Sequence, residues 1–235
     1  MNTDLKTVLA KIAKDRERTN ILKKHEQKAL AILVRRIPSW INSDMLTVIG
    51  MAGSLLIMVS FVIAASLSRY YLLLGIAGFA INWFGDSLDG RLAYFRNKPR
   101  RWYGFSLDFC ADWWSIICIG AGFIIYVGIQ WELWGFAFVV LYGWAMMMAL
   151  LRYKITDIYT IDSGIIGPTE VRIVISLILA LEIFVPGSIH YSTVVACALL
   201  FIFNLIDFLN LLKIADRRDR NDRLRKEQQV DITNA

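Results

Sequence analysis

Five stretches of this chain contain no Asp, Glu, Lys or Arg over 16 to 24 residues, and they constrain its fold more than any other feature. A helix that crosses the hydrocarbon core of a bilayer needs about 20 apolar residues. Each run therefore predicts a membrane-spanning helix, and a sixth, shorter one is predicted at 171–185, ended by Pro186 and Gly187. The five runs are 45–68, 70–85, 113–131, 133–151 and 183–206.

The composition agrees, because 57% of the 235 residues are hydrophobic, which is too apolar for an ordinary soluble domain. We therefore predict an all-α integral membrane protein with six transmembrane helices and an N-terminal cytoplasmic interfacial helix. We predict that residues 1–40 form a cytoplasmic N-terminal amphipathic segment, 41–213 a six-helix transmembrane domain, and 214–235 a charged cytoplasmic tail. About 40 polar residues precede the first span, which argues against a cleavable signal peptide.

The positions of the basic residues predict the orientation. Of 26 Lys and Arg residues, 10 precede the first span, five lie between spans two and three, three between spans four and five, and seven follow the sixth, which leaves Arg69 alone on the other side. Cytoplasmic loops carry the excess of Lys and Arg. We therefore predict a multi-pass protein with both termini in the cytoplasm. Anionic membrane lipids suffice as a partner for the net charge of +6, and nucleic acid is not predicted.

Residues 21–37 form a candidate helix before the first span. A helical arrangement puts its apolar residues on one face and its basic residues on the other. Such a helix either lies in the membrane interface or packs on the protein, and the sequence leaves both open. The predicted apolar face consists of Leu22, Ala29, Leu30, Leu33 and Ile37.

Four aspartates flank the short connection between spans two and three. Asp86 and Asp89 are three residues apart, and Asp108 and Asp112 are four apart. Both spacings put each pair on one face of a helix, and antiparallel neighbours would bring the two pairs to the same depth. Clustered carboxylates beside lipid are costly unless cations compensate them. All-oxygen ligands select hard ions, Mg²⁺, Mn²⁺ or Ca²⁺, rather than zinc.

Small residues accompany the acids. Gly90 lies one turn after Asp86, Ala93 lies one turn after Asp89, and Gly104 is predicted in the loop before span three. A glycine inside a helix costs about 1 kcal/mol relative to alanine, so close approach of a bulky group is a plausible reason for Gly90. Acids that can bind metal ions, small residues that leave space and nearby basic residues together suit a phosphate-bearing ligand.

From Asp86 to Asp112 the pattern reads D-x2-D-G-x2-A-Y-x9-G-x3-D-x3-D. It resembles the signature of the CDP-alcohol phosphotransferases, D-x2-D-G-x2-A-R-x8-G-x3-D-x3-D, with seven of the eight fixed residues present. Tyr94 replaces the arginine, and the spacer after it has nine residues instead of eight. Arg96, two positions further on, is the candidate for the missing charge.

The resemblance implies a six-helix fold over about residues 40–215, a tendency to form homodimers, and displacement of CMP from a CDP-linked lipid or alcohol by a second alcohol. It implies Mg²⁺ or Mn²⁺ as cofactor and Asp86, Asp89 and Asp108 as metal ligands. Asp112 would be the general base and also a ligand of a second metal. Nucleotide contacts would come from Gly90, Ala93 and Thr47, and Gly104 would allow close approach near the diphosphate.

Three bases are candidates for binding the acceptor. Arg152 and Lys154 follow span four, and Arg172 begins span five. Relatives that use phosphorylated polyols hold the acceptor phosphate with bases in this region, which favours inositol phosphate, inositol or glycerol phosphate as acceptor and CDP-diacylglycerol as donor. The same residues could also be ordinary positive-inside anchors.

Two other functions stay open. A CDP-linked headgroup could be the donor, with diacylglycerol or a ceramide-like lipid as acceptor. A divalent-cation transporter would also place acids in a membrane, although its pathway should carry polar groups through the bilayer, whereas these acids all lie on one side. Metal-dependent release of CMP distinguishes the transferase from the transporter.

Overall fold

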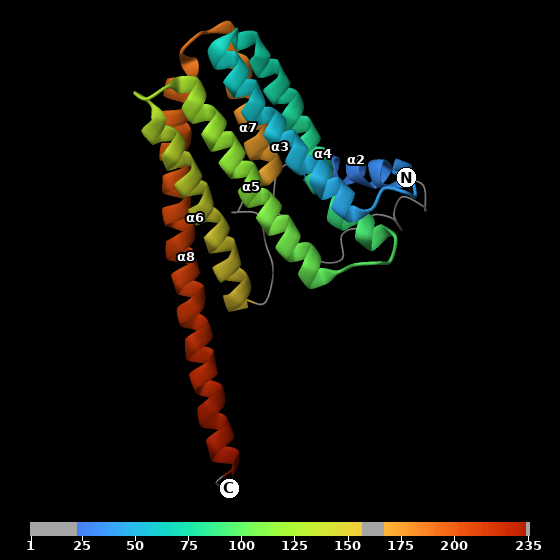
Figure 1. The fold of residues 1–235 in the computed structure, drawn as a ribbon. Helices are drawn as coiled ribbons and strands as arrows, with labels where there is room; N and C mark the ends of the chain where they lie inside the picture. Colours follow the sequence, from blue (N-terminus) through green and yellow to red (C-terminus); the bar gives the residue numbers. More distant parts are fainter. Residues whose placement is uncertain (1–22, 157–166, 234–235) are drawn as a thin grey trace.

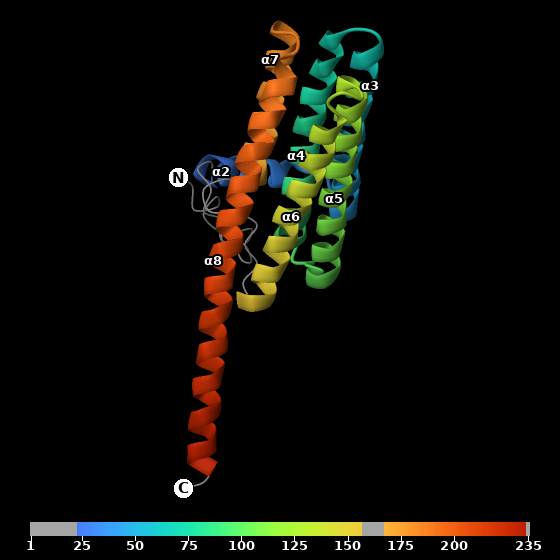
Figure 2. The ribbon, with the colours of Figure 1, turned by 90° about the vertical axis from the view of Figure 1, so that its left-hand side faces the viewer.

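The computed structural model describes residues 23–156 and 167–233, and this part of the chain is helical, without strands. The long helices run side by side, while α2 lies across them (Figure 1, Figure 2). The elements are α2 (Lys23–Arg36), α3 (Ser43–Ser66), the 3-10 helix η1 (Arg69–Tyr71), α4 (Leu72–Phe95), α5 (Arg101–Val127), α6 (Glu132–Thr156), α7 (Pro168–Phe184) and α8 (Ser188–Thr233).

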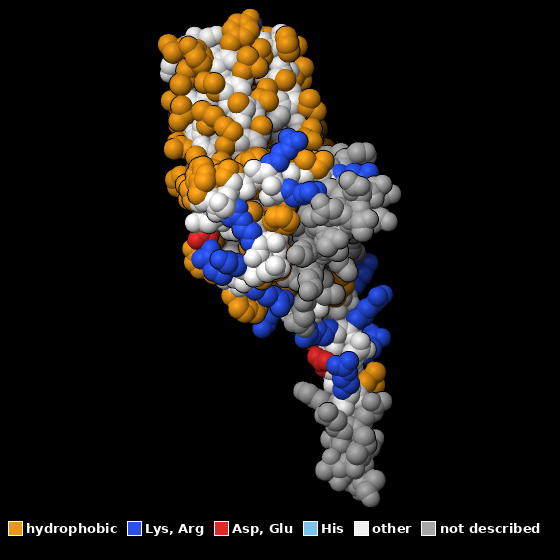
Figure 3. Space-filling model, turned by 90° about the vertical axis from the view of Figure 1, so that its right-hand side faces the viewer, with side chains coloured by type: hydrophobic (Ala, Val, Ile, Leu, Met, Phe, Trp, Pro, Cys, Tyr) orange, Lys and Arg blue, Asp and Glu red, His pale blue; other side chains and the backbone are white. Residues whose placement is uncertain are grey.

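Within the described residues, five segments are long and apolar enough to cross a membrane: α3, η1 with α4, α5, α6, and Ser188–Arg225 of α8. Figure 3 shows hydrophobic side chains covering one end of the molecule, with Lys and Arg gathered beyond them and along the projecting part of α8. These features confirm an all-α, multi-pass integral membrane protein. The sixth predicted span corresponds to α7, whose 17 residues reach about 26 Å, so the count of six spans stays a prediction.

Helices α3 and α4 touch backbone to backbone. A Cβ atom added to Gly85 would lie 2.4 Å from the backbone nitrogen of Gly50, and one added to Gly53 would lie 2.5 Å from the backbone nitrogen of Asn82. Small residues permit such close approach between membrane helices, where packing rather than the hydrophobic effect drives association. This contact holds the start of α3 against the end of α4, where the first pair of aspartates lies.

The amphipathic helix α2 packs on the bundle. Its buried apolar residues, Leu30, Ala31 and Val34, form a cluster with Leu46 of α3 and Leu88 and Leu92 of α4. Of the predicted face, Leu30 is buried and Leu33 and Ile37 pack partly against this cluster, whereas Leu22 lies outside the described residues. Ala29 is half-buried, and the buried face also includes Ala31 and Val34, which the prediction did not name.

One predicted boundary differs from the structure, and another lies within a continuous helix. Helix α5 begins at Arg101, so Gly104 lies in its first turn and not in a loop. Helix α8 continues without a break to Thr233, so the predicted boundary between 213 and 214 falls inside one helix. The charged segment contains no Gly or Pro to end a helix, and Arg220 pairs with Asp216 one turn away at 3.3 Å.

Candidate active site

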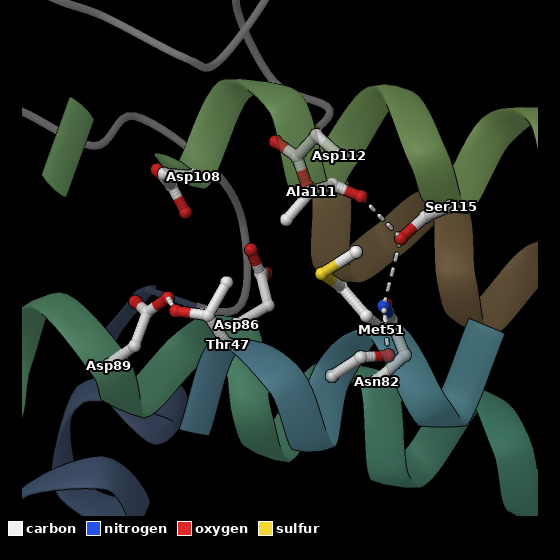
Figure 4. Close-up of a pocket in the computed structure, with 10 residues that line it drawn as sticks. Thr47, Met51, Asn82, Asp86, Asp89, Asp108, Ala111, Asp112 and Ser115 are labelled. Atoms are coloured by element: carbon white, nitrogen blue, oxygen red, sulfur yellow. Dashed lines mark hydrogen bonds between the residues drawn. The ribbon is translucent and has the colours of Figure 1, made fainter. Parts of the chain in front are cut away.

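The four aspartates meet in one pocket at the end of the bundle where α4 ends and α5 begins (Figure 4). Helix α4 contributes Asp86 and Asp89, and α5 contributes Asp108 and Asp112, as expected for antiparallel neighbours. Helix α3 supplies one wall of the pocket. The lining residues are Thr47, Gly50, Met51, Asn82, Asp86, Asp89, Asp108, Ala111, Asp112 and Ser115.

Asp89 is the more buried of the two acids of α4, with 6% of its surface exposed. The hydroxyl of Thr47 donates a hydrogen bond of 2.7 Å to Asp89 Oδ2. The backbone N–H of Gly90 donates to Asp89 Oδ1. Hydrogen bonds to both oxygens offset part of the free-energy cost of burying this carboxylate, and they also fix its orientation. The predicted nucleotide residue Thr47 therefore lines the pocket and orients one of the acids.

Arg172 supplies positive charge from α7. Its Nη2 lies 2.7 Å from Asp86 Oδ2 and 3.8 Å from Asp112 Oδ1. One guanidinium thus joins an acid of α4 to an acid of α5. The carboxylates of Asp86 and Asp112 keep 23% and 33% of their side-chain surface exposed, so both stay accessible from the pocket.

A group of hydrogen-bonded side chains forms the floor of the pocket, and the sequence reasoning missed it. The amide of Asn82 donates to Ser54 Oγ at 2.9 Å and to Ser115 Oγ at 3.2 Å, and Ser54 donates to Ser115 at 2.7 Å. Asn82 and Ser115 lie one turn from Asp86 and Asp112, on the same helix faces. One sequence signal could have identified Asn82 and Ser115: each is a polar residue one turn from an acid, within an otherwise apolar run.

Three other predicted nucleotide or diphosphate contacts lie outside the lining of the pocket. Gly90 and Ala93 occupy the end of α4, and Gly104 occupies the first turn of α5. A Cβ atom added to Gly104 would have no neighbour within 4 Å, so protein packing does not require a glycine there.

Arg172 is the one among the three predicted acceptor bases that contacts the acids. Arg152 instead pairs with Asp207 of α8, and neither Arg152 nor Lys154 lines the pocket. The Lys154 side chain is exposed, and its backbone carbonyl accepts a hydrogen bond of 3.4 Å from Arg218. The end of α6 is therefore tied to α8.

Arg96 also lies apart from the pocket. Its guanidinium donates to backbone carbonyls in the connection between α2 and α3, including Pro38 at 2.8 Å and Ile41. It therefore holds this connection against the end of α4, and we do not assign it the role of the arginine that Tyr94 replaces.

The pocket has the donor chemistry that a hard divalent cation requires, because four carboxylates face one space. Among the described residues, however, no three His, Cys, Asp or Glu side chains are grouped in an arrangement that would hold one ion. Thr47 engages Asp89, and Arg172 engages Asp86 and Asp112. The residues thus fit Mg²⁺ or Mn²⁺ by type and location, and their carboxylates would have to rotate to bind it.

A comparison with protein families identifies the chain. The model of the CDP-alcohol phosphatidyltransferase family matches residues 40–209, which is more than half of the sequence and includes all four aspartates. No curated protein matches the chain. Members of the matched family are membrane transferases of substituted phosphate groups in phospholipid synthesis and generally depend on a divalent metal. The chain belongs to the CDP-alcohol phosphatidyltransferase family.

Proposed function

We propose that this enzyme transfers a phosphatidyl group from CDP-diacylglycerol to the hydroxyl of a small polar alcohol and releases CMP. The observation that carries the proposal is the pocket in which four aspartates of α4 and α5 face one another. Membership of the family supports transfer from a CDP-alcohol, and the exposed apolar side chains of the membrane-crossing helices support access to a lipid substrate.

In this proposal Asp86, Asp89 and Asp108 hold Mg²⁺ or Mn²⁺, and Asp112 also contacts a second ion. A metal ion held by these acids would screen the diphosphate and would stabilise negative charge on the transferring phosphoryl group and on CMP. Thr47 keeps Asp89 turned toward α3 through its hydrogen bond. Nucleotide contacts come from Thr47, Gly90 and Ala93.

Asp112 acts as the general base. Its carboxylate takes the proton of the acceptor hydroxyl while that oxygen forms a bond to the phosphorus atom of the phosphatidyl group. The bond between this phosphorus and the bridging oxygen breaks at the same centre, and CMP leaves with that oxygen. Asp112 suits the role because it lines the pocket and stays partly exposed. Gly104, one turn before Asp108, leaves open space for the diphosphate.

The acceptor carries an anionic group that Arg172 binds, which favours inositol phosphate or glycerol phosphate, with inositol as an uncharged candidate. Arg172 lies beside the proposed base, so a phosphate bound there would bring the acceptor hydroxyl toward Asp112. Arg152 and Lys154 remain further candidates at the end of α6. Arg152 would first have to leave Asp207.

The pocket opens toward the cytoplasm in this proposal, and both termini lie on the same side. The support is the distribution of Lys and Arg along the sequence. We also propose that the enzyme works as a homodimer, as the family resemblance suggests.

An assay of CMP release tests the proposal. The purified full chain in detergent micelles is given CDP-diacylglycerol with Mg²⁺ or Mn²⁺, and inositol phosphate, glycerol phosphate, inositol and serine are compared as acceptors. Release that requires the metal and one phosphorylated acceptor is the expected result. Release only from a CDP-linked headgroup with diacylglycerol would reverse the two substrates, and no release from any CDP-linked donor would overturn the proposal.

A further inference from the structure

Arg172 occupies an unusual place for an acceptor-binding residue, because it is already engaged by the acids. Its guanidinium lies 2.7 Å from Asp86 and 3.8 Å from Asp112, and only 13% of its side chain is exposed. These are two of the carboxylates to which we assign metal ions. A charged donor this close to both acids offsets the repulsion between them.

The backbone that carries Arg172 is fixed at the start of α7. The hydroxyl of Thr169 donates a hydrogen bond of 3.1 Å to Glu26 of α2, and both residues are buried. The carboxylate of Glu170 accepts a hydrogen bond of 3.1 Å from the backbone N–H of Gly167, which caps the helix. Arg172 lies within one turn of these anchors, so its long side chain can change partners while its backbone stays in place.

A guanidinium and a hard divalent cation compete for the same carboxylate oxygens. We infer that Arg172 is an internal counter-cation, which leaves Asp86 and Asp112 when a divalent cation binds there and then receives the anionic group of the acceptor. The inference rests on the proposed function for the role of these acids and for the charge of the acceptor. It also gives Arg172 a role in acceptor specificity. With an uncharged acceptor, Arg172 would have no anionic partner and would continue to compete with the metal for Asp86 and Asp112.

Thermodynamic linkage gives this arrangement a measurable consequence. If the metal releases Arg172 for an anion, then the anion must tighten binding of the metal by the same factor. Couplings of this kind range from about 5-fold to 150-fold. A simple structural ion pair between Arg172 and Asp86 would show no such effect.

Binding of Mn²⁺ to the full chain in detergent provides a readout that does not depend on turnover. Electron paramagnetic resonance of free aqueous Mn²⁺ is titrated against wild-type protein, with and without glycerol phosphate. We expect glycerol phosphate to tighten Mn²⁺ binding at least about fivefold. An unchanged affinity in wild-type protein would overturn the inference without recourse to any variant.

Substitutions at Arg172 test the same competition. Arg172→Gln should bind Mn²⁺ at least about fivefold more tightly than wild type and should lose the effect of glycerol phosphate. Complexes between Mn²⁺ and glycerol phosphate in solution affect both proteins equally, so this variant also controls for them. Arg172→Lys keeps the charge but loses the planar fork, and we expect intermediate Mn²⁺ affinity. Equal or weaker Mn²⁺ affinity in Arg172→Gln would overturn the inference.

Arg152→Gln is the matched control for loss of a largely buried arginine. Arg152 pairs with a single aspartate of α8, and its side chain is 15% exposed, against 13% for Arg172. Without glycerol phosphate, its Mn²⁺ affinity should equal that of wild type. If Arg152→Gln gained as much Mn²⁺ affinity as Arg172→Gln, loss of any nearby positive charge would explain the effect. That result would contradict a specific role of Arg172.

The proposed function and this inference can fail separately. Absence of CMP release, together with the expected Mn²⁺ titrations, would reject the reaction and keep the competition at Asp86 and Asp112. Release of CMP from a phosphorylated acceptor, with no coupling between glycerol phosphate and Mn²⁺, would keep the reaction and reject the competition.

Discussion

Thr47 of α3 and Asp89 of α4 are joined by a hydrogen bond of 2.7 Å between buried side chains. The bond links two helices whose backbones already touch near Gly50 and Gly85. It therefore fixes one acid of the pocket relative to the most closely packed part of the bundle.

Replacing Thr47 with Val should destabilise the protein. The substitution keeps the shape and removes the donor to Asp89, which then loses a partner inside the bundle. We expect a loss of about 1–3 kcal/mol in the free energy of unfolding. Thermal unfolding in detergent without substrate measures the change, and Thr47→Ser, which keeps the hydroxyl, is the control. A Thr47→Val protein as stable as wild type would show that the bond contributes little.

Asp112→Asn should keep the fold and lose transfer. The amide has the same shape as the carboxyl group but cannot accept the proton of the acceptor, and general bases contribute about 10²–10⁴-fold to rate. The rate of CMP release at saturating substrate measures the loss. Asp44→Asn is the control, because Asp44 pairs with Arg100 at the surface and lies outside the pocket. Turnover of Asp112→Asn like that of wild type would exclude its role as base.

Gly85→Ala should destabilise the protein, whereas Gly104→Ala should not. A Cβ atom at Gly85 would lie 2.4 Å from backbone atoms of α3, which cannot rotate away. Overpacking of this kind costs about 1–3 kcal/mol. At Gly104 a Cβ atom meets open space, and alanine favours the helix by about 1 kcal/mol.

Thermal unfolding in detergent compares these two variants directly. Activity adds a second outcome for Gly104→Ala, since the proposed close approach of the diphosphate predicts slower CMP release in a protein of equal or greater stability. Full activity in Gly104→Ala would remove Gly104 from the site.

Asn82→Leu should loosen the floor of the pocket. The amide of Asn82 bridges Ser54 of α3 and Ser115 of α5, and leucine has a similar size without any donor. We expect a loss of about 1–3 kcal/mol in the free energy of unfolding, measured by thermal unfolding in detergent. Ser66→Ala is the control, because the Ser66 hydroxyl bonds only to its own helix, at Val62. Equal stability of Asn82→Leu and Ser66→Ala would contradict the bridging role.

The fold was largely predictable because lipid imposes a simple requirement on sequence. The charge-free run 45–68 matches α3 closely, since a hydrocarbon core excludes charge over the length of a helix. The run 70–85 ends ten residues before α4 does. Its helix continues through Asp86 and Asp89 because these acids face a pocket between helices rather than lipid.

The meeting of the four aspartates was predictable because the members of each pair are close in sequence. The spacing of the four aspartates fixed their helix faces, and one short connection brought the two pairs together. The contact of Arg172 with Asp86 joins residues 86 positions apart and depends on how α7 packs beside α4, which no local pattern reveals. The predicted face of α2 included Leu30, Leu33 and Ile37 of the cluster but not Ala31 and Val34, whose burial depends on how α2 packs on α3 and α4.

The glycine contact between α3 and α4 divides the pocket into a fixed wall and an adjustable one. Thr47 and Asp89 lie on the two helices whose backbones touch at Gly50 and Gly85, so the positions of their Cα atoms are fixed relative to each other. Asp108 and Asp112 lie on α5, which near the pocket meets α3 through side chains, as in the hydrogen bond between Ser54 and Ser115. A ligand that enters between the two walls must therefore be accommodated by α5 and by the side chain of Arg172.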